Sequence, residues 1–441
     1  MCSIYTVFLG LSLLLLLPRD AVGTCKLQAT FNAPLTLTGF GTKLLLSDSL
    51  GTYEREYGES IDLYCGSGFT FERGYESVGT SDAKATLRCD SNGLFYHNSG
   101  SLIGVQCKKA VMQMFESRTS MQNCGADMTL VVGQRFDGGG LIKSAALCYD
   151  IVASQMKYIG YTTFPAKNRV ITMSQVGQLN GIGLDVNVTY RKNLIRTVSQ
   201  GEIDAYMAKE KQLAPLFEAE TFQVAGLVQD EYVARHLAGY EDMMSTIWMR
   251  SLRAGNWKNW IKAMQGASVA GTHFDVRLGV SGVLEVPMAV GPCNASRSLQ
   301  VQLADGSSYP VPAHIWAHVH AVEQTGGVQD EFVVIGHNSP FLRSDNSSHL
   351  CASMCDQVSW LRNSLFGSLR EFPAYGVVQC CRVEDVASKL DNFPGPFAAV
   401  NAGRTTAKVQ LLDLLTHATD TTTVPPPDYD PEPSYSSSND Y

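Results

Sequence analysis

Cysteines at the ends of short alternating runs restrict most strongly how this chain can fold. Between residues 24 and 110, apolar and polar residues alternate in runs that lead to Cys65, Cys89 and Cys107. Such period-two alternation, interrupted by glycine and asparagine turns, is typical of antiparallel strands with one buried face. We therefore expect residues 24–110 to form a small β module stapled by disulfides. It contains no reactive cluster, so its expected role is that of a scaffold or docking unit.

Residues 1–23 have the pattern of a secretory signal peptide. An apolar run from Val7 to Leu17 is followed by a proline and by the small residues Ala21 and Gly23, although a basic start is missing. A membrane anchor is the alternative, but the run is shorter than the roughly 20 apolar residues that cross a bilayer. We therefore expect a secreted, extracellular protein without membrane attachment.

Export would place eleven cysteines in an oxidising compartment, where they are expected to form disulfides. Because the number is odd, one thiol is left over or pairs between chains. Zinc would require tightly spaced Cys and His clusters. The nearest candidates are Cys351 with Cys355 and the adjacent Cys380 and Cys381, and no metal is expected there. Glycosylation sequons occur at Asn187, Asn294 and Asn346.

The rest of the chain mixes two kinds of pattern and predicts an α+β domain over residues 120–417. A capping box from Ser199 to Glu202 predicts a helix through Phe217, and residues 242–264 predict a second helix broken at most by Gly255. Strands are expected at 128–132, 170–173, 283–286, 299–303, 315–322 and 332–335.

The C-terminal segment 418–441 is acidic and rich in proline, tyrosine and serine, so it is expected to be a disordered tail. The formal net charge of the chain is −8, and five acidic residues without any Lys or Arg lie in this tail. The remainder of the chain is therefore close to neutral. The average charge does not exclude a nucleic-acid partner, because a near-neutral fold can still carry a local basic face.

Residues 221–262 carry a more specific pattern. The sequence Arg253-Ala-Gly-Asn-Trp257 is similar to the Asn-x-Gly-Asn-Trp motif that begins the metal-binding helix of arthropod DNA/RNA non-specific endonucleases. Further landmarks of insect secreted nucleases follow in the same order, at 146–150, 281–284, 309–312, Trp316, 336–340, Cys351, Cys355, Trp360, Cys380 and Cys381. The chain thus resembles a degenerate member of this ββα-metal nuclease family, and most closely the salivary nuclease-like proteins of tsetse flies. The resemblance implies an α+β, ββα-metal nuclease-like mixed core behind the β module.

The residues that carry the chemistry in this family are replaced here. The resemblance places Arg253 where active members hold Mg²⁺ with an asparagine, and Ile261 where they have a glutamate. A hard divalent cation needs oxygen ligands, and neither side chain supplies one. Val224 and Gly226 stand in place of the motif's arginine and its general-base histidine. With Met244 as a further degenerate position, no intact catalytic set and no metal are expected.

An alternative register keeps a histidine. It aligns Ala234-Arg235-His236-Leu237 with the base motif, which makes His236 the candidate base but requires a deletion before Arg253. The corresponding function is a weak Mg²⁺-dependent endonuclease with a metal site rebuilt from Glu241 or Asp242.

Basic residues gather in the same segment: Arg235, Arg250, Arg253, Lys258 and Lys262. The last four would share about half of the helix surface at roughly 100° per residue, if the helix is regular. They form either an ordinary solvated face or a phosphate-binding face, for which arginine is well suited. Trp260 is a candidate for stacking on a nucleobase, whereas Trp257 is expected to pack in the core.

The resemblance implies a secreted, salivary-type insect protein that binds the backbones of DNA and RNA without sequence preference. Endonuclease activity is expected to be absent or residual, and no cofactor is expected. Besides the weak nuclease, the sequence leaves open a protein-interaction module that binds a host protein through the acidic tail.

Histidines alternate with other residues at His314, His318 and His320, and Trp316 lies between them. All four share one face if this segment is a strand. A metal pair is one interpretation, but a solvated or hydrogen-bonded strand face is the more ordinary one.

Overall fold

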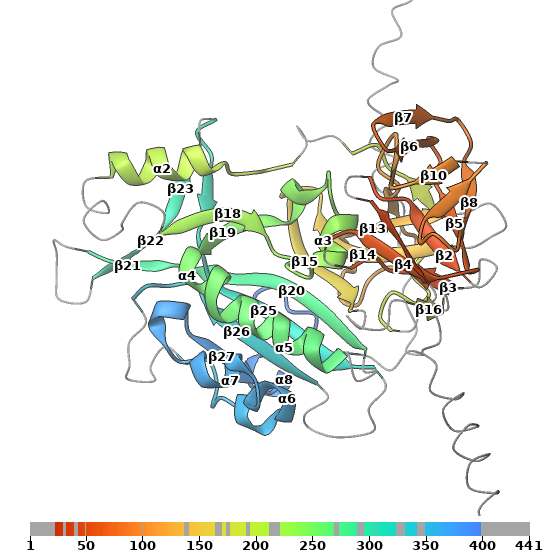
Figure 1. The fold of residues 1–441 in the computed structure, drawn as a ribbon. Helices are drawn as coiled ribbons and strands as arrows, with labels where there is room; N and C mark the ends of the chain where they lie inside the picture. The colour runs from red at the N-terminus through yellow and green to blue at the C-terminus, as the bar shows by residue number, and fades with distance from the viewer. Residues whose placement is uncertain are drawn as a thin grey trace, which may run out of the picture.

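The computed structural model describes residues 23–397, with gaps at 30–31, 39–42, 49, 99, 136–140, 164–169, 173–176, 191–194, 211–220, 269–272, 289–294, 304, 323–330 and 342–348. The expected leader and acidic tail lie outside the described residues, and so do Cys293, Asn294 and Asn346. The described chain forms an N-terminal β unit and a larger second unit, which lie side by side (Figure 1).

The N-terminal unit consists of two sheets. Its strands are β1 (Thr24–Gln28), β2 (Leu35–Thr38), β3 (Lys43–Leu45), β4 (Thr52–Glu56), β5 (Ser60–Tyr64), β6 (Phe69–Arg73), β7 (Glu76–Gly79), β8 (Lys84–Cys89), β9 (Phe95–His97), β10 (Gly100–Leu102) and β11 (Gly104–Cys107). One sheet has the order β4-β1-β11-β6-β7 and the other β10-β9-β8-β5-β2-β3-β16. The last of these, β16 (Val170–Thr172), pairs with β3 although it lies far along the chain. The two units are thus joined by a shared sheet.

The alternating runs before the cysteines are strands, as the sequence predicts. In β8, every second residue is buried, and the run ends at Cys89. Disulfides join Cys25 to Cys89 and Cys65 to Cys107. These two disulfides stabilise a unit that is too small to bury a large apolar core by itself.

A nine-stranded sheet in the order β17-β12-β13-β14-β15-β20-β25-β26-β27 forms the second unit. Its strands are β12 (Gln113–Glu116), β13 (Met128–Arg135), β14 (Leu141–Asp150), β15 (Gln155–Thr162), β17 (Val186–Asn187), β20 (Phe274–Val283), β25 (Pro312–Ala321), β26 (Glu331–His337) and β27 (Val378–Cys381). Every neighbouring pair in this sheet is antiparallel. Both faces are covered: Ile315 of β25 belongs to the apolar cluster that includes helix α5 (Lys258–Ser268), and Trp316 to the cluster that includes α8 (Val383–Val386).

Three strand pairs and several short helices complete the second unit (Figure 1). The pairs are β18 (Phe222–Gly226) with β19 (Ser245–Met249), β21 (Glu285–Pro287) with β22 (Ser296–Ser298), and β23 (Gln300–Gln302) with β24 (Ser308–Pro310). The other helices are α2 (Gln200–Lys209), α3 (Glu231–His236), α4 (Arg250–Leu252), α6 (Ser359–Arg362) and α7 (Leu365–Leu369), with single turns at Glu241–Met244, Cys355–Gln357 and Pro373–Tyr375. The predicted capping box begins α2: Ser199 accepts from the Glu202 backbone N–H, and Glu202 from that of Ser199. This helix ends at Lys209, and the rest of its predicted span to Phe217 reaches into residues that are not described.

The expected fold class was wrong. The protein is mostly β, with 43% strand and 19% helix, and it is built from large antiparallel sheets rather than from an α+β ββα-metal core. The physical reason lies in the nine-stranded sheet, whose central strands are buried on both faces. Strands of this kind are nearly continuous apolar runs without a clear period, and such runs cannot be told from buried helix by pattern alone.

The helix predicted over residues 242–264 was also wrong in its first part. Ser245–Met249 is strand β19, and the helix begins only at Arg250. The next turn, Arg253–Trp257, is a π-helical turn in which Gly255 leaves the helical conformation, with φ −94° and ψ −111°. The helix is therefore kinked at the predicted break, and its cations do not follow one regular helical face.

Among the described residues of the second unit, three disulfides are formed: Cys124–Cys148, Cys351–Cys381 and Cys355–Cys380. The last two pairs account for the cysteines whose spacing was nearest to that of a zinc site. No helix in the described part of the chain has the length and apolar character needed to cross a membrane.

Candidate functional site

The residues that the resemblance places at catalytic positions lie on one local element. It consists of the strand pair β18–β19, the single turn Glu241–Met244 before β19, and the helix that follows. Phe222 pairs with Met249 and Gly226 with Ser245, and the Arg250 N–H donates to the carbonyl of Thr221 at 2.9 Å. The helix thus starts beside the beginning of β18, about four residues or roughly 13 Å along the strand from Gly226. The element holds the five positions but does not by itself bring Gly226 to the helix start.

None of these positions offers a group for acid–base or metal chemistry. Met244 and Ile261 are each 3% exposed, and their side chains are apolar. The site of a Cβ on Gly226 has no atom within 4 Å, so there is room for a side chain but none is present. Met244 and Ile261 therefore serve packing, and residue type alone leaves Gly226 and Ile261 without a side-chain base or an oxygen ligand.

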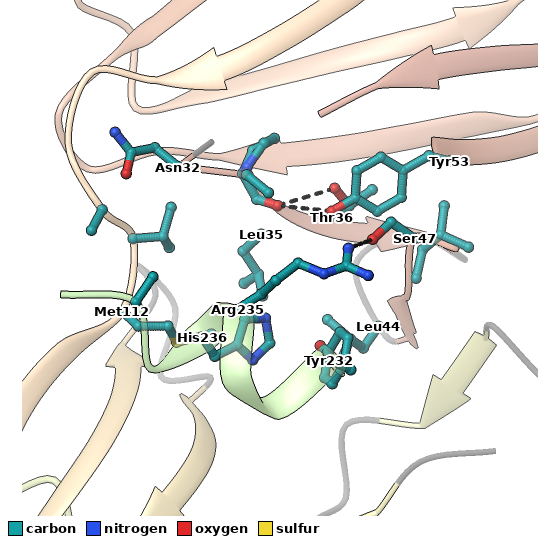
Figure 2. Close-up of a pocket in the computed structure, with 16 residues that line it drawn as sticks. Asn32, Leu35, Thr36, Leu44, Ser47, Tyr53, Met112, Tyr232, Arg235 and His236 are labelled. Atoms are coloured by element: carbon teal, nitrogen blue, oxygen red, sulfur yellow. Dashed lines mark hydrogen bonds between the residues drawn. The ribbon is translucent and has the colours of Figure 1, made fainter. Parts of the chain in front are cut away.

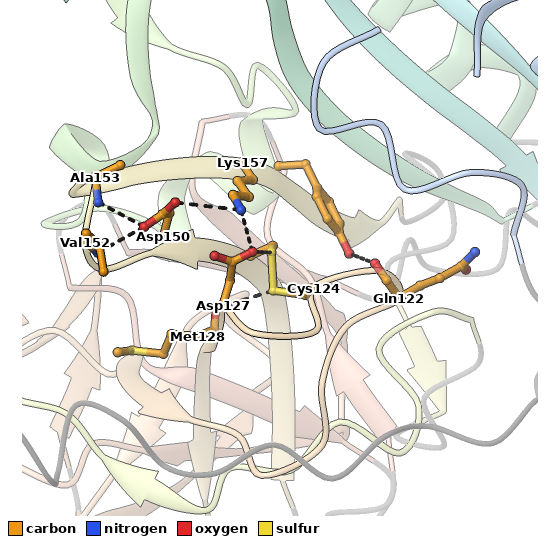
Figure 3. A network of polar contacts seen from close by, with 10 residues as sticks. Gln122, Cys124, Asp127, Met128, Asp150, Val152, Ala153 and Lys157 are labelled. Carbon is orange, nitrogen blue, oxygen red and sulfur yellow. Dashed lines mark hydrogen bonds and ion pairs between the residues drawn. A yellow bond between two sulfur atoms is a disulfide. The ribbon is translucent and has the colours of Figure 1, made fainter. Parts of the chain in front are cut away.

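Among the described residues, one group of possible metal ligands has its atoms close enough together to hold an ion. It consists of Cys124, Asp127 and Cys148. The two cysteines are joined to each other in a disulfide. Lys157 Nζ donates to Asp127 at 2.7 Å and lies 3.7 Å from Asp150 (Figure 3). This group is a structural ion-pair network around a disulfide rather than a metal centre.

Four basic side chains project from the helix segment. Arg250, Lys258 and Lys262 are exposed. Lys258 and Lys262 are four residues apart in α5 and so lie on one face of it. Arg253 is partly buried, burial lowers the pKa of its guanidinium, and its Nε has no hydrogen-bond partner among the described residues. No acidic residue occurs between Asp242 and Asp275, so the segment has a local positive charge.

Arg235 lies elsewhere, at the junction of the two units (Figure 2). Its guanidinium donates to Ser47 Oγ and to the Asp48 carbonyl, both at 2.9 Å, and so ties α3 to the N-terminal unit. It lines a mainly apolar cavity of about 230 Å³ between the units, together with Leu35 and Met112. Arg235 thus acts as a structural tie and is not grouped with the cations of α5.

His236, the alternative base, lines the same cavity. Burial, together with the nearby Arg235, lowers its pKa to about 4. Nδ1 lies 2.7 Å from Ser144 Oγ. His236 does not form a metal-ligating group with Glu241 or Asp242 in the described part of the chain.

The tryptophans of this region belong to the core. Trp248, Trp257 and Trp260 are 0% exposed, and Trp257 makes ring contacts with the other two at centroid distances of 5.4 and 5.1 Å. Trp257 packs as predicted. Trp260 presents no face to solvent on which a nucleobase could stack.

Two exposed aromatic residues lie next to the helix start and were missed in the sequence. Phe372 is 57% and Tyr375 is 45% exposed, in the turn after α7. Asn256, which is fully buried, donates to the carbonyls of Leu369 and Gly376 at 2.7 and 2.6 Å and holds this turn against the helix. The local signal was that each aromatic residue directly precedes a residue typical of surface turns, Pro373 or Gly376.

The histidines of β25 lie on a covered face. His318 has a fully buried side chain, and its Nε2 lies 2.8 Å from Glu331 Oε1. Phe397 packs against the rings of His318 and His320, at centroid distances of 4.4 and 5.1 Å. This agrees with the hydrogen-bonded strand face proposed from the sequence.

His318 predicts a pH dependence of stability. Burial lowers its pKa to about 4 from an ordinary 6.5, so acidification between these values protonates the unfolded chain before the folded one. Stability is therefore fully present above pH 6.5 and is lost as the pH falls towards 4. His318 alone is expected to lower the free energy of unfolding by about 1 kcal/mol between pH 6.5 and 5.5.

Urea unfolding at both pH values measures this effect. It is applied to the parent, to His318→Gln and to the control His97→Gln. The His318 variant should lose that share of the pH dependence, and the His97 variant, on the N-terminal unit, should keep it. An unchanged pH dependence in His318→Gln contradicts the prediction.

The sequence matches no protein-family profile, and no curated protein matches it. Among solved structures, one similar chain comes from the crystal structure of the EndoG/EndoGI complex, which describes the mechanism of EndoG inhibition. The two chains are 12% identical with a TM-score of 0.26, and the match covers 44% of this chain and 72% of that chain. A TM-score this low does not establish a shared fold.

Proposed function

We propose that the protein binds the backbone of DNA and RNA, without sequence preference, through the helix segment that follows β18–β19. One observation carries this proposal: Arg250, Lys258 and Lys262 are exposed. They lie between Asp242 and Asp275, where the sequence has no other acidic residue. Arginine and lysine contact phosphates through charge-assisted hydrogen bonds, and such contacts are independent of base sequence.

Binding rather than cleavage is proposed because the groups needed for hydrolysis are missing at the candidate positions. Gly226 has no side chain to accept a proton, and Ile261 has no oxygen ligand. Arg253 stands where the resemblance expects a cation's ligand, and its guanidinium is itself a positive charge. An arginine there can attract a phosphate but cannot activate water as a metal ion does.

We also propose that the protein is exported and glycosylated. The leader-like residues 1–23 and five disulfides support an oxidising compartment. Asn187 is exposed on β17, as an acceptor for a glycan must be.

The proposed function predicts binding that does not depend on a divalent metal. The purified mature protein is mixed with plasmid DNA and with double-stranded RNA, in Mg²⁺ or in EDTA, and both mobility shift and cleavage are scored. Both nucleic acids should be shifted in EDTA, without multiple-turnover cleavage in Mg²⁺. The logarithm of the affinity should fall linearly with the logarithm of the salt concentration. The slope should be about −0.9 for each phosphate contacted on duplex DNA.

The variant Arg253→Asn serves as the control for chemistry. It restores the family's metal ligand but leaves Gly226 and Ile261 in place, so it is expected to bind less tightly and still not to cleave. Rapid EDTA-sensitive digestion by the parent, or an affinity that is indifferent to salt, contradicts the proposed function.

A further inference from the structure

The turn between α7 and β27 exposes two aromatic rings on a unit whose other large aromatics are mostly buried. Phe372 is 57% exposed and Tyr375 is 45% exposed. No other large aromatic side chain in the described part of the second unit is classed as exposed. Trp248, Trp257 and Trp316, by contrast, are 0% exposed. Large apolar rings in water are unfavourable unless a partner covers them, so a pair in one turn suggests a binding role.

The turn is held rigidly against the helix start. Besides the two hydrogen bonds from Asn256, the Tyr375 N–H donates to the Phe372 carbonyl at 3.0 Å, and the Gly376 N–H to that of Pro373 at 2.9 Å. Gly376 has a φ of +77°, and a Cβ there would lie 2.4 Å from the Leu252 Cα. A fixed turn presents its rings with little loss of conformational entropy on binding.

The turn that carries the rings lies against the basic segment. A Cβ on Gly255 would lie 2.4 Å from the Tyr375 carbonyl oxygen, so the backbone of the turn touches the helix between Arg253 and Lys258. Arg370, just before the turn, forms ion pairs with Asp356 and Glu371 at 3.2 and 2.8 Å. The cations nearest to the turn that can meet a phosphate are therefore those of the helix segment.

We propose that Phe372 and Tyr375 form a stacking platform for unpaired nucleobases, and that the preferred ligand is single-stranded nucleic acid whose backbone follows the cations of the helix. This inference rests on the proposed function and specifies its ligand class. Aromatic stacking is available to every base but only when the base is unpaired, because the bases of a duplex already stack on each other. Cations without aromatic rings would not distinguish single strands from duplexes in this way.

The test uses fluorescence anisotropy with the mature protein in EDTA and low salt. The probes are an end-labelled oligo(dT) 20-mer, which is unstructured, and a labelled 20-base-pair duplex. Single-strand binding should be tighter than duplex binding in the parent. The double variant Phe372→Ala with Tyr375→Ala should lose about 10- to 100-fold of its affinity for oligo(dT) and change less than about 2-fold for the duplex.

Two further variants separate stacking from other effects. The conservative pair Phe372→Trp with Tyr375→Phe should retain the affinity for oligo(dT), because rings remain. Tyr75→Ala, which removes a fully exposed tyrosine from the N-terminal unit, should have no effect. Thermal unfolding of each variant verifies that the fold is kept.

The outcomes distinguish the two proposals. Failure of the parent to bind either probe overturns the proposed function and this inference with it. The stacking platform alone is overturned if the parent binds both probes and the double alanine variant keeps both affinities. It is also overturned if that variant loses affinity for both probes by the same factor. An equal loss in Tyr75→Ala also overturns it, since the effect would then belong to exposed aromatics in general.

Discussion

The triple variant Arg250→Gln, Lys258→Gln, Lys262→Gln is expected to bind duplex DNA about 100-fold more weakly than the parent at fixed, near-physiological salt. The three side chains are exposed on the helix segment, and glutamine keeps their length while removing their charge. Three solvent-exposed phosphate contacts of about 1 kcal/mol each correspond to roughly this factor. The slope of log affinity against log salt should decrease by nearly three at the same time. Anisotropy titrations at several salt concentrations measure both quantities.

A matched control separates a local interface from total charge. The control also removes three positive charges, through Lys43→Gln, Arg88→Gln and Lys109→Gln. These residues are exposed and lie in the N-terminal unit or just after its last strand. This control should bind nearly as tightly as the parent. Equal losses in the two triple variants would mean that only net charge matters, and no loss in the helix variant would place the interface elsewhere on the molecule.

Replacement of Asn338 by alanine is expected to lower the free energy of unfolding by about 3 to 5 kcal/mol. Asn338 is fully buried, and its Nδ2 donates to the carbonyls of Ile247 and Pro312, both at 2.9 Å. Its Oδ1 accepts from the Met249 N–H. The side chain therefore connects strand β19 to the nine-stranded sheet, and alanine would leave three buried backbone groups without their partner.

Urea unfolding at neutral pH measures this loss, and Asn363→Ala is the control. Asn363 is exposed at the end of α6, so the same change there should alter stability by less than about 0.5 kcal/mol. A free energy of unfolding for Asn338→Ala within about 1 kcal/mol of the parent value would show that the surrounding backbone finds other partners.

Some features of the protein depend on residue type and local spacing alone, and these were accessible from the sequence. The strand that ends at Cys89 is half-buried, so its apolar and polar residues alternate visibly. The helix start at Ser199 is fixed by a reciprocal pair of hydrogen bonds within four residues. Likewise, residue type alone shows that Gly226 and Ile261 carry neither a side-chain base nor an oxygen ligand.

Other features were decided by contacts between distant segments. Ser245–Met249 has an apolar pattern that suits a helix, but pairing with β18 makes it a strand. Pairing of this kind depends on another segment of the chain, so no local window of the sequence records it. The fold class failed for the same reason, because strands covered on both faces lose the alternation that would identify them.

The candidate site shows the same division. The cations of the helix segment were visible in the sequence, but the position of Arg235 was not, because its partners Ser47 and Asp48 lie in the N-terminal unit. Burial of Trp260, and exposure of Phe372 and Tyr375, are likewise properties of the packed molecule. The sequence by itself determined which chemistry the side chains can supply, whereas the tertiary structure decided which side chains meet and which reach solvent, since burial and proximity arise only when distant segments pack together.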